Sequence, residues 1–395
     1  MPPNPKFSYF LYSNTTLVDS NHVVWRQPLP LSRNYSGKKD GSSISHGDYF
    51  GAVRTFLENR GLEILLRAAT LQLQQKVKPE DIREIRIRLE KHGEFYHPAR
   101  IEVPIGQQSI FFVLNVAVSE TGIRTIHEEY RNLKRLNDGF PLSFLPQVYG
   151  FGQTTTAGKR KISMFLGQWF EGYNEFHISR DMSDNSEKII VWDDAGSHYF
   201  LSTEQQSELY RQAARILAYY YNAETFEQIF AWHHAAGDFI VRIENGLLDL
   251  KLITVRRYAP LIQNLNHSEN STQGPEMILQ ALLLFFLGLS IRMRLDRLDG
   301  VSDITWADSR AVPATLEGFF DGLALKPQIL ALPDAIDQCF GYYLSVCSQK
   351  DLFELTKAVA NEFNPRSAET SIVKQHLEAH VESLHRSIEL FLHKS

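Results

Sequence analysis

Hydrophobic and polar residues alternate along the chain between residues 84 and 119. In residues 85–89, for example, isoleucine or leucine alternates with arginine. A period of two puts one face of a segment in a core and the other in solvent, which predicts β-strands. Residues 109–118 form a longer apolar run rich in β-branched side chains, which also favours a strand. The predicted strands are 85–89, 100–103, 109–118, 144–152 and 162–169.

A helical period replaces this alternation in most of the remaining chain, where apolar residues recur three or four positions apart. Ser202 followed three positions later by Gln205 predicts a capped helix start. Asp48 is predicted to be an N-cap, and Pro333 suits the first position of a helix. The predicted helices are 49–60, 62–76, 123–136, 202–221, 275–298, 316–323, 333–349, 351–364 and 370–394.

A hairpin is predicted to interrupt the helices after Asp238. Asn245-Gly246 separates the apolar runs 239–243 and 247–253, and both residues tolerate the positive φ that a type I′ turn requires. Polar residues lie at the open end of this hairpin, which makes the surrounding stretch a candidate site. They are Asp238, Thr254, Arg256 and Arg257.

The order of the predicted elements divides the chain into three parts. Residues 1–80 are an N-terminal extension, irregular over its proline-rich first 45 residues and then helical. Residues 81–170 form a small sheet lobe of five strands with one helix after the third. Residues 171–395 form a larger, mainly helical lobe that carries the hairpin. The predicted fold class is α+β, with a five-stranded antiparallel sheet.

Composition and net charge indicate which binding partners and which cellular compartment to expect for this protein. A chain of 395 residues exceeds what one hydrophobic core usually holds. The net charge of −5 comes without a basic block, so neither nucleic acid nor an anionic membrane surface is expected. Cys339 and Cys347 lack the spacing of metal ligands, and a reduced, cytoplasmic protein is expected. The apolar run 278–291 is shorter than the roughly 20 residues that span a bilayer, and predicts a buried core helix.

The order of strands, inserted helix, polar loop, hairpin and helical remainder resembles the protein-kinase-like fold over about residues 81–395. Within that fold the helical remainder is similar to the aminoglycoside and choline phosphotransferase branch. The resemblance implies two lobes with a ligand cleft between them. It also implies phosphoryl transfer from ATP with a divalent metal, so ATP and a divalent metal are the cofactors to consider.

The resemblance assigns nucleotide-binding roles to the sheet lobe. The glycine-containing turn that approaches the phosphates corresponds to Gly93, with Lys91 beside it. The lysine of the third strand is replaced by Asn115, and its helix partner maps to Glu129. Gln168 lies in the segment whose backbone would contact an adenine ring. Two structural alternatives stay open, an ordinary strand connection at the turn and a hydrogen bond between Asn115 and Glu129 that holds helix to sheet.

The catalytic loop is the part that departs most from the family. Asp238 matches the catalytic base because it precedes the hairpin strand. The family's His two residues earlier is Ala236, its Asn five residues later is Ile243, and its metal-binding Asp falls at Thr254. Each such group carries a large factor in phosphoryl transfer, so a conventional magnesium-dependent mechanism is hard to assemble from these residues.

Histidines and arginines add to the candidate site. The resemblance would place five histidines around the cleft: His92, His97, His177, His233 and His234. They fit three roles, as ligands of a divalent metal, as acid–base or phosphate contacts, or as structural hydrogen-bonding groups. His376 and His380, on the last predicted helix, are expected on a solvated face.

Arg256 and Arg257 could bind a phosphate or carboxylate of a substrate through paired guanidinium N–H donors. His177 is a further candidate substrate contact. Structural salt bridges are the alternative for the two arginines. Their candidate partners are Glu171, Asp193 and Asp194.

Three functions remain open. The first is an atypical phosphotransferase, with Asp238 as base and His233 or His234 orienting a small-molecule or protein substrate. The second is a nucleotide-binding pseudokinase or non-catalytic regulatory module that acts through a protein partner. The third is a His-rich, metal-dependent hydrolase. The missing catalytic groups favour the second function, whereas the clustered polar residues favour the first.

Overall fold

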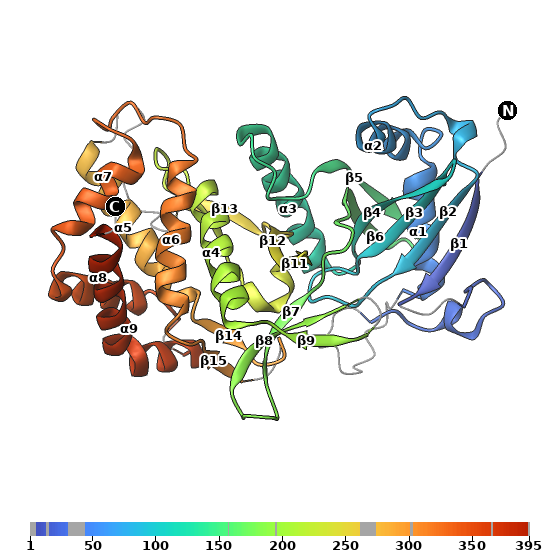
Figure 1. Ribbon diagram of the computed structural model, residues 1–395. Coiled ribbons are helices and arrows are strands. Elements are labelled where there is room, and N and C mark those ends of the chain that lie inside the picture. The colour runs from blue at the N-terminus through green and yellow to red at the C-terminus, as the bar shows by residue number, and fades with distance from the viewer. Residues whose placement is uncertain are drawn as a thin grey trace. The chain divides into compact units, whose positions relative to one another are not determined.

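The computed structural model describes residues 5–12, 16–30, 44–156, 158–193, 196–260, 274–300, 303–364 and 366–393. The described part is an α+β structure that separates into two compact units, Met1–Glu171 and Gly172–Ser395. Figure 1 shows the largest sheet in the first unit and most of the helices in the second.

The first unit is built on a six-stranded sheet in the order β1-β2-β3-β4-β6-β5. Its strands are β1 (Lys6–Leu11), β2 (Glu84–Leu89), β3 (Ala99–Ile105), β4 (Gln108–Ala117), β5 (Val148–Thr155) and β6 (Lys161–Gln168). β1 runs parallel to β2 and the other neighbours are antiparallel. The prediction of a five-stranded antiparallel sheet is therefore wrong in one strand, because Lys6–Leu11 adds a parallel edge.

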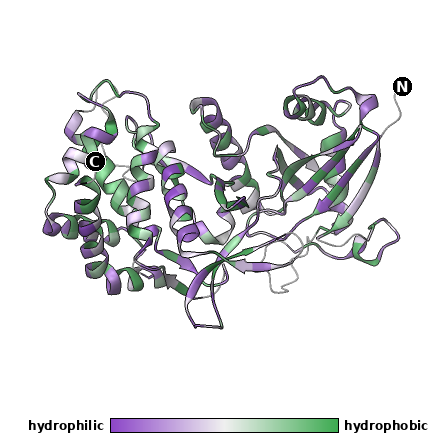
Figure 2. Cartoon of the chain, in the orientation of Figure 1, coloured by the Kyte–Doolittle hydropathy of each residue, from purple (hydrophilic) through white to green (hydrophobic). Residues whose placement is uncertain are grey.

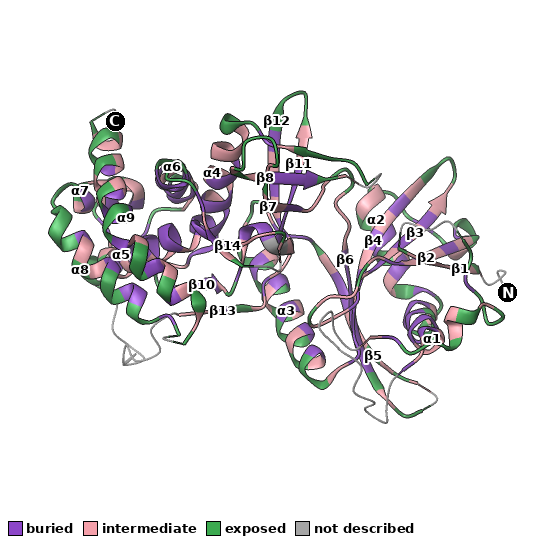
Figure 3. Cartoon of the chain, turned by 90° about the horizontal axis from the view of Figure 1, so that it is seen from below, coloured by how far each residue is buried: buried purple, intermediate pink, exposed green. Residues whose placement is uncertain are grey.

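Helices cover both faces of this sheet. The helical segments are η1 (Val23–Arg26), α1 (His46–Glu58), α2 (Glu63–Leu73), η2 (Pro79–Asp81) and α3 (Glu120–Gly139). On β6, Met164 and Leu166 belong to the core cluster that contains Phe50 of α1. Phe165, between them, meets the ring of Tyr130 of α3. Successive strand residues point to opposite faces, so α1 and α3 pack on opposite sides of a strand buried along nearly its whole length (Figure 3).

The first helix begins one turn earlier than its sequence suggests. Ser45 is the N-cap of α1, and its hydroxyl accepts a hydrogen bond from the backbone N–H of Asp48. The Asp48 carboxylate in turn accepts the Ser45 N–H, which completes a capping box. The prediction of Asp48 as N-cap is wrong, because the N-cap is Ser45 and Asp48 is the third residue of the helix.

The second unit combines helices with small two- and three-stranded sheets. Its strands are β7 (Phe176–Arg180), β8 (Glu187–Trp192), β9 (His198–Phe200), β10 (Glu227–Phe230), β11 (Phe239–Glu244), β12 (Leu247–Leu252), β13 (Arg257–Pro260), β14 (Leu295–Arg297) and β15 (Ile304–Trp306). Its α-helices are α4 (Thr203–Tyr220), α5 (Pro275–Arg292), α6 (Ala311–Ala324), α7 (Ile336–Ser345), α8 (Gln349–Asn361) and α9 (Ala368–Leu392). The predicted Ser202–Gln205 capping box of α4 is confirmed. Pro333 lies before α7 and does not open it.

Helix α5 is strongly apolar and lies among the mostly green helices of the second unit in Figure 2. Among the described residues it alone is long and apolar enough to cross a membrane by length and composition. Half of that segment is buried inside the protein, and buried core helices satisfy the same two criteria. Phe285 stacks on Tyr221, and Phe286 packs against Phe319 and Phe340, so aromatic rings bind α5 to its neighbours.

Two glycines allow α4 and α6 to pack closely. A Cβ at Gly318 would overlap the carbonyl oxygen of Arg211, and one at Gly322 would lie 2.5 Å from the carbonyl oxygen of Arg215. Both obstacles are backbone atoms of α4, which cannot rotate away. Gly318→Ala is expected to lower the free energy of unfolding by about 3 kcal/mol, as measured by urea denaturation.

Gly288→Ala is the matched control. The same methyl group placed in the middle of α5 would meet its nearest atom, Val359 Cγ1, at an ordinary 3.6 Å. This variant is expected to gain roughly 0.5–1 kcal/mol, because alanine favours a helix more than glycine does. Equal effects of the two substitutions would contradict close packing at Gly318.

Candidate functional site

The predicted hairpin is present as β11 and β12. Its turn residues Asn245 and Gly246 both have positive φ, 52° and 79°, as a type I′ turn requires. Directly before it the chain forms η3 (His234–Asp238), a single wide turn of π type. Gly237 has a φ of 85°, which favours glycine at this point. Turns of this type frequently occur at functional sites, and this one delivers Asp238 to the start of β11.

The Asp238 carboxylate is held by four hydrogen-bond donors. Arg256 donates from Nη1 to Oδ2 at 3.0 Å and from Nη2 to Oδ1 at 2.6 Å. The hydroxyl of Thr254 donates to Oδ1 at 2.8 Å, and the backbone N–H of His233 donates to Oδ2 at 2.9 Å. Asp238 is only 1% exposed. Both carboxylate oxygens thus accept hydrogen bonds, and a bidentate salt bridge with Arg256 neutralises the negative charge.

This geometry joins four residues that the sequence analysis singled out: Asp238, Thr254, Arg256 and His233. Arg256 forms its salt bridge with Asp238. The sequence suggested Glu171, Asp193 or Asp194 as its partner, and Asp194 lies outside the described residues. Arg257 is exposed on β13, where it lies opposite Phe230 of β10 in the strand register. The roles of these residues as base, cofactor contact or substrate contact stay predictions.

His234, the first residue of η3, is fully buried. Its Nδ1 is 3.1 Å from Oδ2 of Asp296. Sequence reasoning missed Asp296 because it assigned the residue to the helix 275–298, whereas α5 ends at Arg292 and Asp296 lies in β14. The same oxygen of Asp296 accepts the backbone N–H of Ala235 at 2.7 Å. Burial lowers the pKa of His234, while the nearby Asp296 charge acts to raise it. The ring of Tyr210 packs edge-on against His234 at 5.3 Å between centroids.

His177 supports the same turn from β7. Its Nδ1–H donates to the carbonyl oxygen of Ala235 at 2.9 Å. Ala235 is therefore held on both sides, its N–H by Asp296 and its carbonyl by His177. The predicted substrate contact at His177 is untested, and in this structure its imidazole fixes the turn that precedes Asp238.

Two candidate residues of the first unit, Glu129 and Asn115, lie on α3 and β4. Glu129 is fully buried in α3 and accepts a hydrogen bond from the hydroxyl of Tyr96. Asn115 lies in β4 opposite Phe165 of β6. The helix is thus tied to the loop before β3 through Tyr96, a residue outside the sequence-based set.

Gly93 and Gln168 form backbone hydrogen bonds within the first unit. Lys91 is exposed. The N–H of Gly93 donates to the carbonyl of Tyr96 at 3.1 Å, and a Cβ there would lie 2.6 Å from that oxygen, so the turn itself favours glycine. The N–H of Gln168 donates to the carbonyl of Gln147 at 2.8 Å. Their predicted contacts with a nucleotide are untested.

His92 and His97 form a cluster with His46 in the first unit. The Nδ1 atoms of His92 and His97 are 3.1 Å apart, so one donates and the other accepts. The other nitrogen of His92 lies 2.6 Å from the hydroxyl of Tyr12. Burial lowers the pKa of His97 to about 3, and the neighbouring His92 and His46 act in the same direction. In the described residues no three His, Cys, Asp or Glu side chains are grouped to hold a metal ion.

His376 and His380 are packed against the protein, so the expected solvated face is wrong. His380 is fully buried, with its Nε2 3.1 Å from the hydroxyl of Ser290. His376 stacks on Trp306 at 5.3 Å between ring centroids. Their spacing of four residues reflects one packed side of α9.

Comparison with known proteins adds little to this geometry. No family model matches the sequence, and no curated protein matches it. A structural neighbour among solved structures is "WaaP in complex with acyl carrier protein". The match covers 67% of this chain and 86% of the neighbour, at a TM-score of 0.31 and 10% sequence identity. A likeness of that size assigns no role to any residue of the candidate site.

Proposed function

We propose that this chain is a kinase-like binding module in which the catalytic-loop position no longer serves phosphoryl transfer. The kinase-like part is supported by the order of elements in the first unit, where α3 follows the third antiparallel strand and two more strands come after it. It is also supported by a hairpin that starts directly after Asp238 in the second unit.

One observation supports the loss of phosphoryl transfer: both oxygens of the Asp238 carboxylate already accept hydrogen bonds from the protein. A general base must accept a proton from its substrate within hydrogen-bonding reach. Asp238 already accepts four hydrogen bonds, two of them from a guanidinium that cannot give up its own proton. Thr254, at the position of the metal-binding Asp, donates a hydroxyl and brings no negative charge.

A nucleotide is the first ligand to test, because the kinase-like resemblance implies it. The full chain would be mixed with ATP or ADP, with and without Mg²⁺, and followed by thermal denaturation and by ATP turnover. Ligand at a hundred times its Kd is expected to stabilise the folded state by about 2.7 kcal/mol. Turnover is expected to stay at background and to be the same in Asp238→Asn.

The outcome that overturns this proposal is turnover well above background that Asp238→Asn abolishes. Thr254→Val serves as the control, because it removes one donor to Asp238 and keeps the carboxylate. Circular dichroism at the assay temperature checks that both variants are folded. Turnover that is lost in Asp238→Asn and kept in Thr254→Val would return Asp238 to the role of base.

A further inference from the structure

The second unit contains a pocket that is lined by none of the candidate site residues. Its volume is about 770 Å³, within the range of small-molecule sites. One wall comes from β7, β8 and the turn between them, a second from β9 and the first two turns of α4, and a third from residues 306–311 before and at the start of α6. All of these residues belong to the second unit, so the pocket is independent of any site in the first unit.

Within the described residues, the hydroxyl of Tyr210 has no hydrogen-bond partner. The residue lines the pocket and is only 6% exposed. Its ring packs against His234, yet no described residue donates to or accepts from its hydroxyl. Buried tyrosine hydroxyls usually find a partner. Burial raises the pKa of Tyr210, so the group stays protonated and can donate to a ligand.

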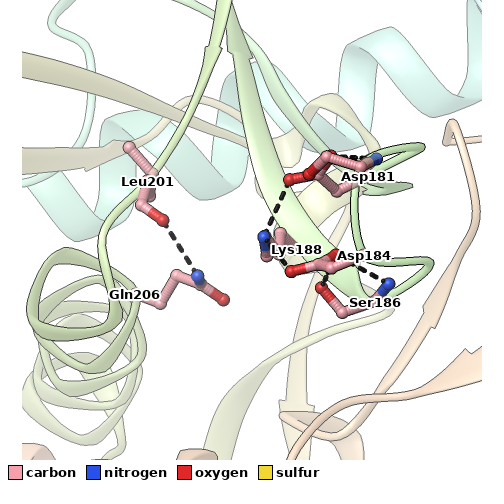
Figure 4. A network of polar contacts seen from close by, with 7 residues as sticks. Asp181, Asp184, Ser186, Lys188, Leu201 and Gln206 are labelled. Carbon is pink, nitrogen blue, oxygen red and sulfur yellow. Dashed lines mark hydrogen bonds and ion pairs between the residues drawn. The ribbon is translucent and has the colours of Figure 1, made fainter.

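The charges on the pocket walls are already satisfied. The Lys188 ammonium is 2.7 Å from the Asp181 carboxylate and 2.6 Å from that of Asp184. Figure 4 shows these two ion pairs, together with the hydrogen bond that the Gln206 side chain donates to the Leu201 carbonyl. Arg310 pairs with Asp308 at 2.7 Å. A charged ligand would have to compete with these internal partners, so the walls favour a ligand without net charge.

The start of α4 also disfavours an anion. Ser202 and Gln205 form a reciprocal cap that satisfies backbone N–H groups of the first turn. Glu204 sits in the same turn, where its carboxylate offsets the positive end of the helix dipole. The groups left for a ligand here are neutral: the Thr203 hydroxyl, and the side-chain amide of Asn185 across the pocket.

We propose that this pocket binds a neutral, hydroxyl-rich small molecule of the size of a mono- or disaccharide, with Tyr210 as a hydrogen-bonding contact. The hydroxyls of such a ligand match the Tyr210, Thr203 and Asn185 groups, and its C–H faces match apolar lining residues such as Phe200 and Ala307. This binding requires neither nucleotide nor phosphoryl transfer, and it stands if the proposed function fails.

Saturation-transfer NMR on the full chain tests the proposal with glucose, N-acetylglucosamine and maltose as neutral probes. Glucosamine and glucuronate are the charged counterparts. At least one neutral saccharide is expected to bind at millimolar concentration, and its charged counterparts about tenfold more weakly. Binding of none of the neutral probes at about 50 mM, or equal binding of the charged ones, overturns the proposal.

Tyr210→Phe removes only the hydroxyl and is expected to weaken binding of the neutral saccharide about fivefold, the loss of one hydrogen bond. Tyr342→Phe, at an exposed position on α7, is the matched control and should leave binding unchanged. The melting temperature of Tyr210→Phe should stay equal or rise, because the hydroxyl has no internal bond to lose. Unchanged binding in Tyr210→Phe, or a clearly lower melting temperature, overturns the assignment.

Discussion

Replacing Arg256 with alanine is expected to lower the free energy of unfolding by roughly 3–5 kcal/mol, the range for breaking a buried ion pair. The cost arises at Asp238, which is 1% exposed and would lose two of its four donors together with the only cation that the structure pairs with it in the described residues. Urea denaturation followed by tryptophan fluorescence measures the loss, and Trp232, buried against Phe239 beside the site, is a local reporter.

Arg257→Ala is the matched control for this prediction. Arg257 is the next residue in the chain, but it is exposed on β13 and should cost no more than about 0.5 kcal/mol. Adding Asp238→Asn to Arg256→Ala removes the stranded charge and is expected to restore part of the stability. If Arg256→Ala cost as little as Arg257→Ala, the ion pair would not be structural, and Asp238 would be available for chemistry.

The sequence predicted the elements on either side of this ion pair but did not predict the pair itself. The strands β2 to β6, the helix α3 and the hairpin were predicted closely, because the spacing of apolar residues and the Asn245-Gly246 turn act locally. The hairpin brings Asp238 and Arg256 to the same open end, but the sequence does not show which acidic side chain the arginine contacts. Asp238 and Arg256 were both singled out, but their mutual pairing was not.

Elements held mainly by distant partners were the ones missed. Lys6–Leu11 follows a proline-rich start and becomes a strand only because β2, more than 70 residues later, offers it an edge. The strands β7 to β9 are short and interrupted by polar turns, so they carry little periodicity of their own. His380 was expected on a solvated face of the last helix, yet it packs against Ser290 of α5. Burial of a polar residue depends on the partner helix, which local spacing does not encode.

Acid is expected to unfold the protein through two buried histidines, one in each unit. Burial lowers the pKa of both His97 and His380 to about 3. In an unfolded chain a histidine has its ordinary pKa near 6.5. Between these values the unfolded chain binds protons that the folded chain does not, so the free energy of unfolding falls as pH drops from about 6.5 towards 3. At about 1.36 kcal/mol per pKa unit, the full effect is roughly 5 kcal/mol for each group.

Substituting either histidine should flatten this dependence in its own unit. His97→Gln and His380→Gln are expected to lose stability near neutral pH and to show a shallower fall between pH 6.5 and 3, as followed by hydrogen exchange with mass spectrometry. Ser290→Ala separates titration from the loss of a contact, because it removes the hydroxyl beside His380 but leaves the imidazole buried. It should cost about 1 kcal/mol at every pH and leave the slope intact. A slope that persists in His380→Gln would mean that other groups govern the acid unfolding of the second unit.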